Sequence, residues 1–149
     1  MRRGQSAIEY TVMFGVSLAI LLGVWIFVNT ANADFRQDLK VGFAKQTVTR
    51  LADAANAVLA QGPPARIYVD VNTPEGVTYV YPDASAACNL SEVLLTLAAQ
   101  QGLSTDVPAP VAANLTGDLS FLINNPGPKR LWVEAIDYNG QPCVKIYGG

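Results

Sequence analysis

One carboxylate, that of Glu9, lies inside a segment that otherwise carries no charge. Residues 7–28 contain no Lys, Arg, Asp, Asn, Gln or Pro, and their number is about what a helix needs to cross a hydrocarbon core of roughly 30 Å. A charged side chain in such a helix costs about 2.5–3.5 kcal/mol, so a carboxylate there needs a partner. The chemistry that Glu9 offers is therefore charge pairing in an apolar environment.

Small residues recur at every fourth position of the same segment, at Ala7, Thr11, Gly15, Ala19 and Gly23. On a helix this spacing places them along one face, where two helices can approach closely. Because Glu9 is an independent reason for contact between helices, we expect this face to pack against another helix. The alternative is an anchor that crosses a membrane alone and whose small residues are accidental.

The residues around Glu9 resemble a known family. The stretch Gly4-Gln5-Ser6-Ala7-Ile8-Glu9-Tyr10 is similar to the processing site of type IV pilin precursors. Its sequence most resembles the motif of the archaeal class III signal-peptide proteins. The resemblance implies that a prepilin-type peptidase cuts between Gly4 and Gln5 on the cytoplasmic side. It also implies that Glu9 is the pilin glutamate of the mature protein. Ala7 and Met13 depart from the Ser and Leu that the family often has there.

An ordinary secretory signal is another interpretation of this N-terminus. Ala31-Asn32-Ala33 imitates its cleavage site, but the apolar run is longer than the short apolar region of such a signal. Arg2 and Arg3 precede the run, and the positive-inside rule then predicts a cytoplasmic N-terminus and an exported C-terminal part.

The pattern after Ala33 predicts that the helix continues to Gln61. Apolar residues recur there every three to four positions, at Phe35, Leu39, Phe43, Val48, Leu51, Ala55 and Val58 or Leu59. Charged residues lie between them, and Gly62-Pro63-Pro64 ends the pattern. We therefore expect a leader over residues 1–4, one long helix over 5–61 and a globular head over 62–149. In the helix, residues up to about 30 form the transmembrane and filament-core half, and the rest form an amphipathic half.

The head reads as mostly β. Alternating residues predict strands over 66–71 and 77–81 with a turn at 73–76, and the clearest hairpin joins 130–138 to 141–147 through Asn139-Gly140. The capping-box form of Asn89-Leu90-Ser91-Glu92 predicts a short helix up to Gly102, although the same run could be a buried strand. A loop is expected over 107–113 and a strand over 119–123. The predicted fold is α+β: a long N-terminal helical stem, like that of a lollipop, and a mostly antiparallel β head carrying a short helix.

Two cysteines, Cys88 and Cys143, both lie on the predicted exported side. Export favours a disulfide between them, because thiols oxidise outside the cytoplasm; two buried free thiols are the alternative. Asn89-Leu90-Ser91 and Asn114-Leu115-Thr116 are N-glycosylation sequons, which makes Asn114 and Asn89 candidate sites on exposed surface. Asn89 could instead serve as the cap of the predicted short helix.

Catalysis finds little support in the sequence. The chain has no His, no Gly-x-Ser-x-Gly and no phosphate-binding loop, so we expect no enzyme, no cofactor and no metal site. A net charge of −2 and a pI near 4.9 give no basic face, so we expect no nucleic-acid partner. The tyrosines of the head (Tyr68, Tyr79, Tyr81, Tyr138 and Tyr147) are either exposed or members of cross-strand pairs.

These features together predict a structural subunit of an archaeal type IV pilus-like surface filament. Its expected partners are other copies of itself in a helical homopolymer, the prepilin peptidase and the pilus assembly machinery. It would be inserted in the cytoplasmic membrane before assembly. After cleavage, the new amine of Gln5 would pair with Glu9 of a neighbouring copy and set the register between subunits. A membrane-anchored exported binding module and a minor pseudopilin of a secretion or Tad-type system are the alternatives.

Overall fold

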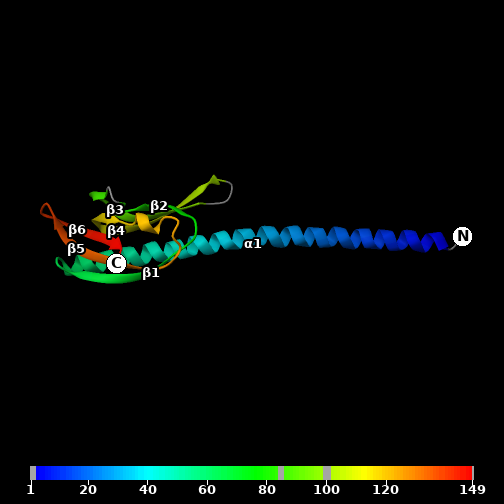
Figure 1. Ribbon diagram of the computed structural model, residues 1–149, viewed down its shortest axis with the longest axis horizontal. Helices are drawn as coiled ribbons and strands as arrows, with labels where there is room; N and C mark the ends of the chain where they lie inside the picture. Colours follow the sequence, from blue (N-terminus) through cyan, green and yellow to red (C-terminus); the bar gives the residue numbers. More distant parts are fainter. Residues whose placement is uncertain (1–2, 84–85, 99–101, 149) are drawn as a thin grey trace. The chain divides into compact units, whose positions relative to one another are not determined.

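The chain consists of one long helix and a six-stranded sheet (Figure 1). The computed structural model describes residues 3–83, 86–98 and 102–148. In chain order the elements are α1 (Arg3–Gln61), β1 (Arg66–Thr73), β2 (Val77–Tyr81), β3 (Ala86–Ala98), β4 (Ser104–Asp118), the 3-10 helix η2 (Ser120–Leu122), β5 (Gly127–Tyr138) and β6 (Gln141–Gly148). The predicted α+β class, with a helical stem and a β head, is confirmed.

The chain divides into two units, Met1–Gln37 and Asp38–Gly149. The second unit contains the last part of α1 together with all of the strands. The predicted end of the helix agrees with the structure. Gly62 follows Gln61 at a φ of 73°, and its N–H donates to the carbonyl oxygens of Val58 and Leu59, both at 3.1 Å. A glycine in the left-handed region is the usual way to satisfy the last carbonyls of a helix.

In the second unit, α1 buries a stripe of small and branched side chains. Its members are Ala44, Thr47, Val48, Leu51, Ala52, Ala54, Ala55 and Val58, which recur at helical spacing and so lie on one side. They form one core with strand residues such as Leu95, Leu115 and Leu131. Three hydrogen bonds in the described part of the chain tie the helix to the sheet. Thr47 Oγ1 donates to the Asn72 carbonyl at 2.9 Å, the Arg50 guanidinium donates to the Asp70 carbonyl at 3.4 Å, and the Ala112 N–H donates to Asn56 Oδ1 at 2.8 Å.

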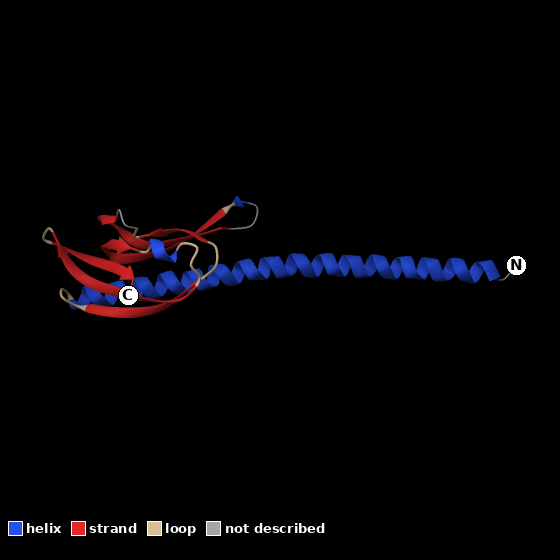
Figure 2. Cartoon of the chain, viewed as in Figure 1, coloured by secondary structure: helices blue, strands red, loops and turns tan. Residues whose placement is uncertain are grey.

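The sheet has the strand order β1-β5-β6-β4-β3-β2. Its two edge strands, β1 and β2, are neighbours in the chain, separated only by residues 74–76. Such a link spans at most about 14 Å, so the sheet must curl until its edges approach each other. The strands therefore surround the buried stripe of α1 (Figure 2). Neighbouring strands are antiparallel except β4 and β6, which are parallel.

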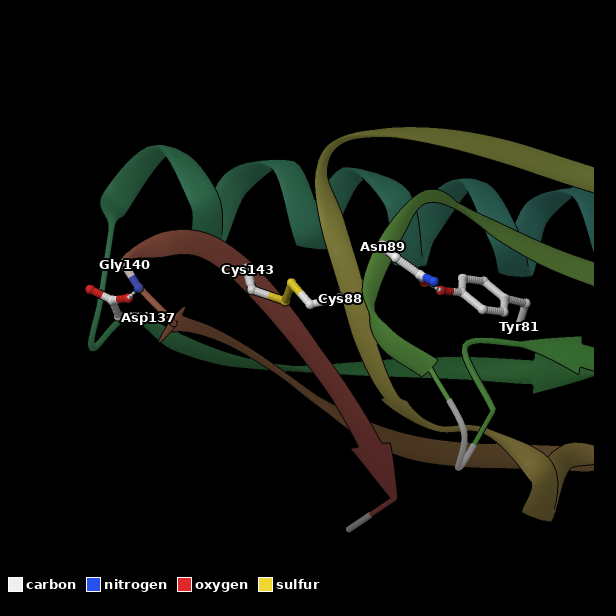
Figure 3. The surroundings of a disulfide bond; sticks show 6 residues. All are labelled: Tyr81, Cys88, Asn89, Asp137, Gly140 and Cys143. Carbon is white, nitrogen blue, oxygen red and sulfur yellow. Dashed lines mark hydrogen bonds between the residues drawn. A yellow bond between two sulfur atoms is a disulfide. The ribbon is translucent and has the colours of Figure 1, made fainter.

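The predicted hairpin at the C-terminus is confirmed. Tyr138 pairs with Gln141 across the two-residue turn, and Asn139 and Gly140 have φ angles of 55° and 82°. Both central residues of this hairpin turn need positive φ, which Asn and Gly tolerate best. The Asp137 carboxylate accepts a hydrogen bond from the Gly140 N–H at 2.7 Å, as Figure 3 shows. The strands predicted over 66–71 and 77–81 are also present, as β1 and β2.

The short helix predicted after Asn89 is wrong, because the residues up to Ala98 form strand β3, the alternative for this segment. Residues 99–101 of the predicted helix lie outside the described part of the chain. Val93, Leu95 and Leu97 are buried in alternation, and β3 pairs with β2 on one side and β4 on the other. Two ladders of hydrogen bonds outweigh a capping signal that is purely local. The Asn89 side chain caps no helix and instead accepts a hydrogen bond from the Tyr81 hydroxyl at 3.3 Å (Figure 3).

The loop predicted over 107–113 is also wrong, because these residues belong to β4. Val107, Ala109 and Val111 are buried, whereas Pro108 and Pro110 are exposed. β6 pairs with β4 only from Asn114 onward, so among the described residues one edge of β4 has no strand partner before Asn114. A proline is tolerated in a strand where its nitrogen faces such an open edge.

The strand predicted over 119–123 is wrong as well. The structure has η2 there, with Leu119 and Leu122 both buried. Their three-residue separation suits a 3-10 turn, which places i and i+3 on the same side. The Asp118 carboxylate accepts the Ser120 N–H at 2.8 Å and so favours the turn over a strand.

Candidate assembly surfaces

The apolar part of α1 is exposed on every side. Its large hydrophobic side chains from Ile8 to Val28 are between 46% and 75% exposed. α1 contains one stretch that is long and apolar enough to cross a membrane. Two hydroxyls of α1 are satisfied within the helix, since Ser17 donates to the Met13 carbonyl at 2.8 Å and Thr30 donates to that of Phe27 at 2.9 Å. Internal satisfaction of polar groups is what a bilayer or an apolar bundle requires.

Three members of the predicted row of small residues are open to the outside in the described part of the chain. Gly15, Ala19 and Gly23 are exposed, and a Cβ added at either glycine would meet no heavy atom within 4 Å. Ala7 belongs to α1, but its side chain lies outside the part that the structure describes. The space beside Gly15 and Gly23 is therefore open.

Glu9 is exposed on α1 between the apolar residues Ile8 and Tyr10. Gly4 and Gln5, the predicted cleavage residues, belong to the first turns of the same helix. The side chain of Gln5 is outside the described part of the chain. The structure thus places Gly4, Gln5 and Glu9 on one helical segment.

The exposed apolar surface of the helix continues beyond the polar residues Asn29–Asp34. In the second unit, Leu39 and Phe43 are 44% and 45% exposed, although they are one helical turn apart and in the predicted amphipathic stripe. In the first unit, Phe35 is 62% exposed. The stripe becomes buried only at Ala44 and beyond. Sequence periodicity alone did not show where the strands stop covering the helix.

The outward side of β1, β5 and β6 carries rows of aromatic and charged residues that the sequence analysis did not identify. The strand register aligns Tyr68, Trp132 and Tyr147 in one row and Arg66, Glu134 and Lys145 in the next; Asp70 and Arg130 face each other in a third. We call these eight residues the aromatic–cation face. The alternation of exposed and buried positions hinted at an outward face, but the pairing that creates the rows is long-range.

The rings and cations of this face contact one another. The Arg66 guanidinium lies 3.9 Å from the centroid of the Trp132 ring, and that of Arg130 lies 5.0 Å from Tyr68. Tyr68 and Trp132 meet edge to face at 5.5 Å between centroids. Tyr68 and Tyr147, two of the tyrosines singled out in the sequence, are therefore members of a cross-strand cluster. Such contacts contribute about 0.5–1.5 kcal/mol each.

Two carboxylates of the face have partners inside it. Asp70 is paired with Arg130 at 2.8 Å between Oδ1 and Nε, and its hydrogen bond with the guanidinium lowers the pKa of the carboxyl group. Glu134 accepts a hydrogen bond from the Tyr147 hydroxyl at 3.1 Å. Partial burial and this hydrogen bond raise the pKa of Tyr147. The remaining cations, Arg66 and Lys145, form no ion pair with any residue in the described part of the chain.

The predicted disulfide between Cys88 and Cys143 is present, with both side chains buried (Figure 3). It connects β3 to β6, and Cys143 pairs in register with Asn114 of the intervening β4. Of the two sequon asparagines, Asn89 is exposed and Asn114 is half-buried.

Residues 3–83, 86–98 and 102–148 contain no group of three or more His, Cys, Asp or Glu that could hold a metal ion. Comparison with known proteins found no match to this chain among protein-family models, curated proteins or solved structures.

Proposed function

We propose that this chain is a subunit of an archaeal type IV pilus-like surface filament. A prepilin-type peptidase removes residues 1–4, and the processed chain is anchored in the cytoplasmic membrane by its apolar helix. Assembly then packs the apolar helices of many copies into a core. The exposed circumference of α1 between Ile8 and Val28 supports this proposal, because so much apolar surface needs lipid or other helices around it.

The observation that carries the proposal is the exposure of Leu39 and Phe43. A lone membrane anchor accounts for an apolar surface only up to about Val28, after which Asn29, Asn32 and Asp34 mark the aqueous side. Each bulky apolar side chain that stays in water beyond that point lacks the roughly 1.5–3 kcal/mol of stabilising free energy that full burial would give. A bundle of neighbouring copies covers them, and a single anchor does not.

Glu9 has a specific task in such a bundle. Cleavage before Gln5 creates a new α-amine one helical turn away from the carboxylate. An ion pair between this amine and Glu9 of a neighbouring copy relieves the cost of burying either charge. Since the pair forms at only one axial offset, it sets the register between subunits.

The experiment that tests the proposal combines the intact mass and N-terminal sequence of protein from the cell surface with electron microscopy. We expect a chain that begins at Gln5 and is present in filaments. A surface protein that begins at Met1 and forms no filaments would establish the anchored binding module instead. A chain that begins near Asn32 would establish a secretory signal, and the stem hypothesis would fail.

A Glu9→Gln variant tests the mechanism of assembly. We expect normal membrane insertion but absent or misregistered filaments, because the amine of Gln5 loses its partner. Glu75→Gln, which changes an exposed carboxylate of the head, is the matched control and should assemble normally. Normal filaments from Glu9→Gln would refute the register pair.

A further inference from the structure

Charge is divided unequally between the two halves of the sheet. Residues 67–128 contain no Lys or Arg. The charged residues of strands β2, β3 and β4 and of their connections are therefore all acidic: Asp83, Glu92, Asp106 and Asp118. The cations of the other three strands are Arg66, Lys129, Arg130 and Lys145. One half of the sheet is purely anionic, and the other carries every strand cation.

The outward side of β2, β3 and β4 forms a second surface. The register aligns Tyr79, Thr96 and Asp106 across the three strands, and Glu92 lies opposite Pro110. Tyr79 is 43% exposed, and Pro108 and Pro110 are exposed as well. We call Tyr79, Glu92, Asp106, Pro108 and Pro110 the acidic face. It combines rigid apolar residues with carboxylates.

The two faces point in different directions. The sheet curls around the last part of α1, and in Figure 1 β1 lies on one side of this helix while β2 and β3 lie on the other. The two faces of one copy therefore cannot meet each other. Each remains open to another molecule.

Four outward-facing charged side chains on the two faces have no oppositely charged partner in the described part of the chain. In the described part of the molecule, Arg66, Lys145, Glu92 and Asp106 form no ion pair. Asp106 accepts a hydrogen bond from the Thr96 hydroxyl at 2.7 Å, which orients the carboxylate but leaves its charge uncompensated. Two cations on one face and two anions on the other are thus available to a partner.

We propose that the aromatic–cation face of one copy docks on the acidic face of the next copy. Trp, Tyr and Arg, which provide five of the eight residues of the aromatic–cation face, are the types that dominate binding energy at interfaces. Opposite charges on the two faces select this pairing and disfavour contact between like faces. Because the two surfaces differ, each contact leaves one free face at either end, so the arrangement grows as an open chain.

This inference rests on the proposed filament, which brings the heads together at high effective concentration. The stems supply cohesion in the core, and the contact between faces determines how neighbouring heads pack on the outside. Interaction between exposed charges is screened by salt. Filaments should consequently lose their head contacts as the salt concentration rises, while the apolar core persists.

The test is a charge swap in the full-length chain. One variant carries Arg66→Glu and Lys145→Glu, a second carries Glu92→Lys and Asp106→Lys, and a third carries all four substitutions. Each of the first two places like charges in contact, so we expect filament yield to fall by about tenfold or more. The third restores opposite charges and should recover wild-type yield and salt resistance. Mixing the first two variants should also restore filaments, with the two kinds of subunit alternating.

Controls separate assembly from folding. Lys45→Glu with Asp53→Lys changes the same charges at exposed positions of α1 outside both faces and should assemble normally. Thermal unfolding in detergent must be unchanged in each variant. Arg66→Glu could fail for a structural reason, because it removes the contact between the guanidinium and Trp132. The double variant Lys145→Glu with Asp106→Lys therefore repeats the charge swap, one charge on each face, and keeps Arg66.

Two results would overturn the docking of these faces: one-face variants that assemble like the wild type, or a fourfold swap that assembles no better than they do. In either case the wild type would still form filaments that depend on Glu9. If the wild type forms no filaments, the proposed function itself fails.

Discussion

Gly117 occupies a position that no other residue can take without displacing the backbone. Its φ is 128°, and a Cβ there would overlap the carbonyl oxygen of Ile146. The two residues pair where β4 and β6 run parallel. A glycine in a strand often marks such a close approach of another backbone.

We predict that Gly117→Ala destabilises the head far more than Gly127→Ala. Both glycines have positive φ, but a Cβ at Gly127 would meet nothing within 4 Å. The control substitution should therefore cost about 1–2 kcal/mol from backbone strain alone. Gly117→Ala must also push β4 and β6 apart and should cost about 1–3 kcal/mol more. Thermal unfolding in detergent measures both, and equal melting temperatures would contradict the predicted overlap.

The Asp118 carboxylate predicts one part of the pH dependence of stability. Hydrogen bonds from the Ser120 side chain and backbone N–H hold its pKa below the usual value. A carboxyl group whose pKa is lower in the folded state stabilises the fold fully above its unfolded pKa of about 4. This stabilisation is lost as the pH falls through the lower, folded pKa.

We expect Asp118→Asn to lose less stability than the wild type when the pH falls from about 5 to 2. Ser120→Ala removes only the hydroxyl partner and should give an intermediate slope. Melting temperatures recorded across this pH range provide the measurement. If the melting temperature of Asp118→Asn falls as steeply with decreasing pH as that of the wild type, Asp118 does not cause this part of the pH dependence.

At the scale of elements, α1 carries two kinds of surface along one continuous helix. From Ala44 onward, its apolar stripe is buried by strands of its own chain. Leu39 and Phe43 follow the same periodicity yet remain exposed. The same periodic pattern therefore packs into the core of the head from Ala44 onward, whereas at Leu39 and Phe43 it remains available for contact with another molecule.

We predict that Leu39→Ser with Phe43→Ser leaves thermal unfolding of the detergent-solubilised chain nearly unchanged but abolishes or weakens filaments. The substituted side chains contribute little to the core of a single copy. Val48→Ser, at a position that is 0% exposed, is the contrasting variant. It should lower the stability of the head by about 2–4 kcal/mol. Wild-type filaments from the double variant would remove the main support for the assembly proposal.

At the scale of the whole molecule, the disulfide joins parts of the chain that are distant in sequence. Cys88 and Cys143 are separated by 55 residues, and the bond connects β3 to β6. A cross-link of this kind stabilises mainly by limiting the unfolded chain, by about 4 kcal/mol for a loop of this size on the chain-entropy estimate.

The Cys88→Ser, Cys143→Ser double variant should therefore melt roughly 10–15 °C below the wild type. A reductant that opens the bond should lower the melting temperature of the wild type by a similar amount and leave the double variant unaffected. Equal melting temperatures with and without the bond would contradict a stabilising role. Thermal unfolding in detergent provides both comparisons.

Features that depend on neighbours in the chain could be predicted from the sequence. The end of α1 before Gly62 and the hairpin at Asn139-Gly140 each depend on a few adjacent residues, and the structure confirms both. The chain has only two cysteines, so one intramolecular disulfide was the single pairing to expect. The long apolar segment with Glu9 inside it is likewise evident from the sequence.

The tertiary structure decided what depends on distant partners. β3 is a strand because β2 and β4 flank it, and β4 tolerates two prolines because one of its edges is open. The aromatic–cation face exists only because β1, separated from β5 by more than fifty residues of chain, pairs with it in one register. Local patterns cannot specify such pairings, since each depends on loop closure and on packing around the helix that the whole head shares.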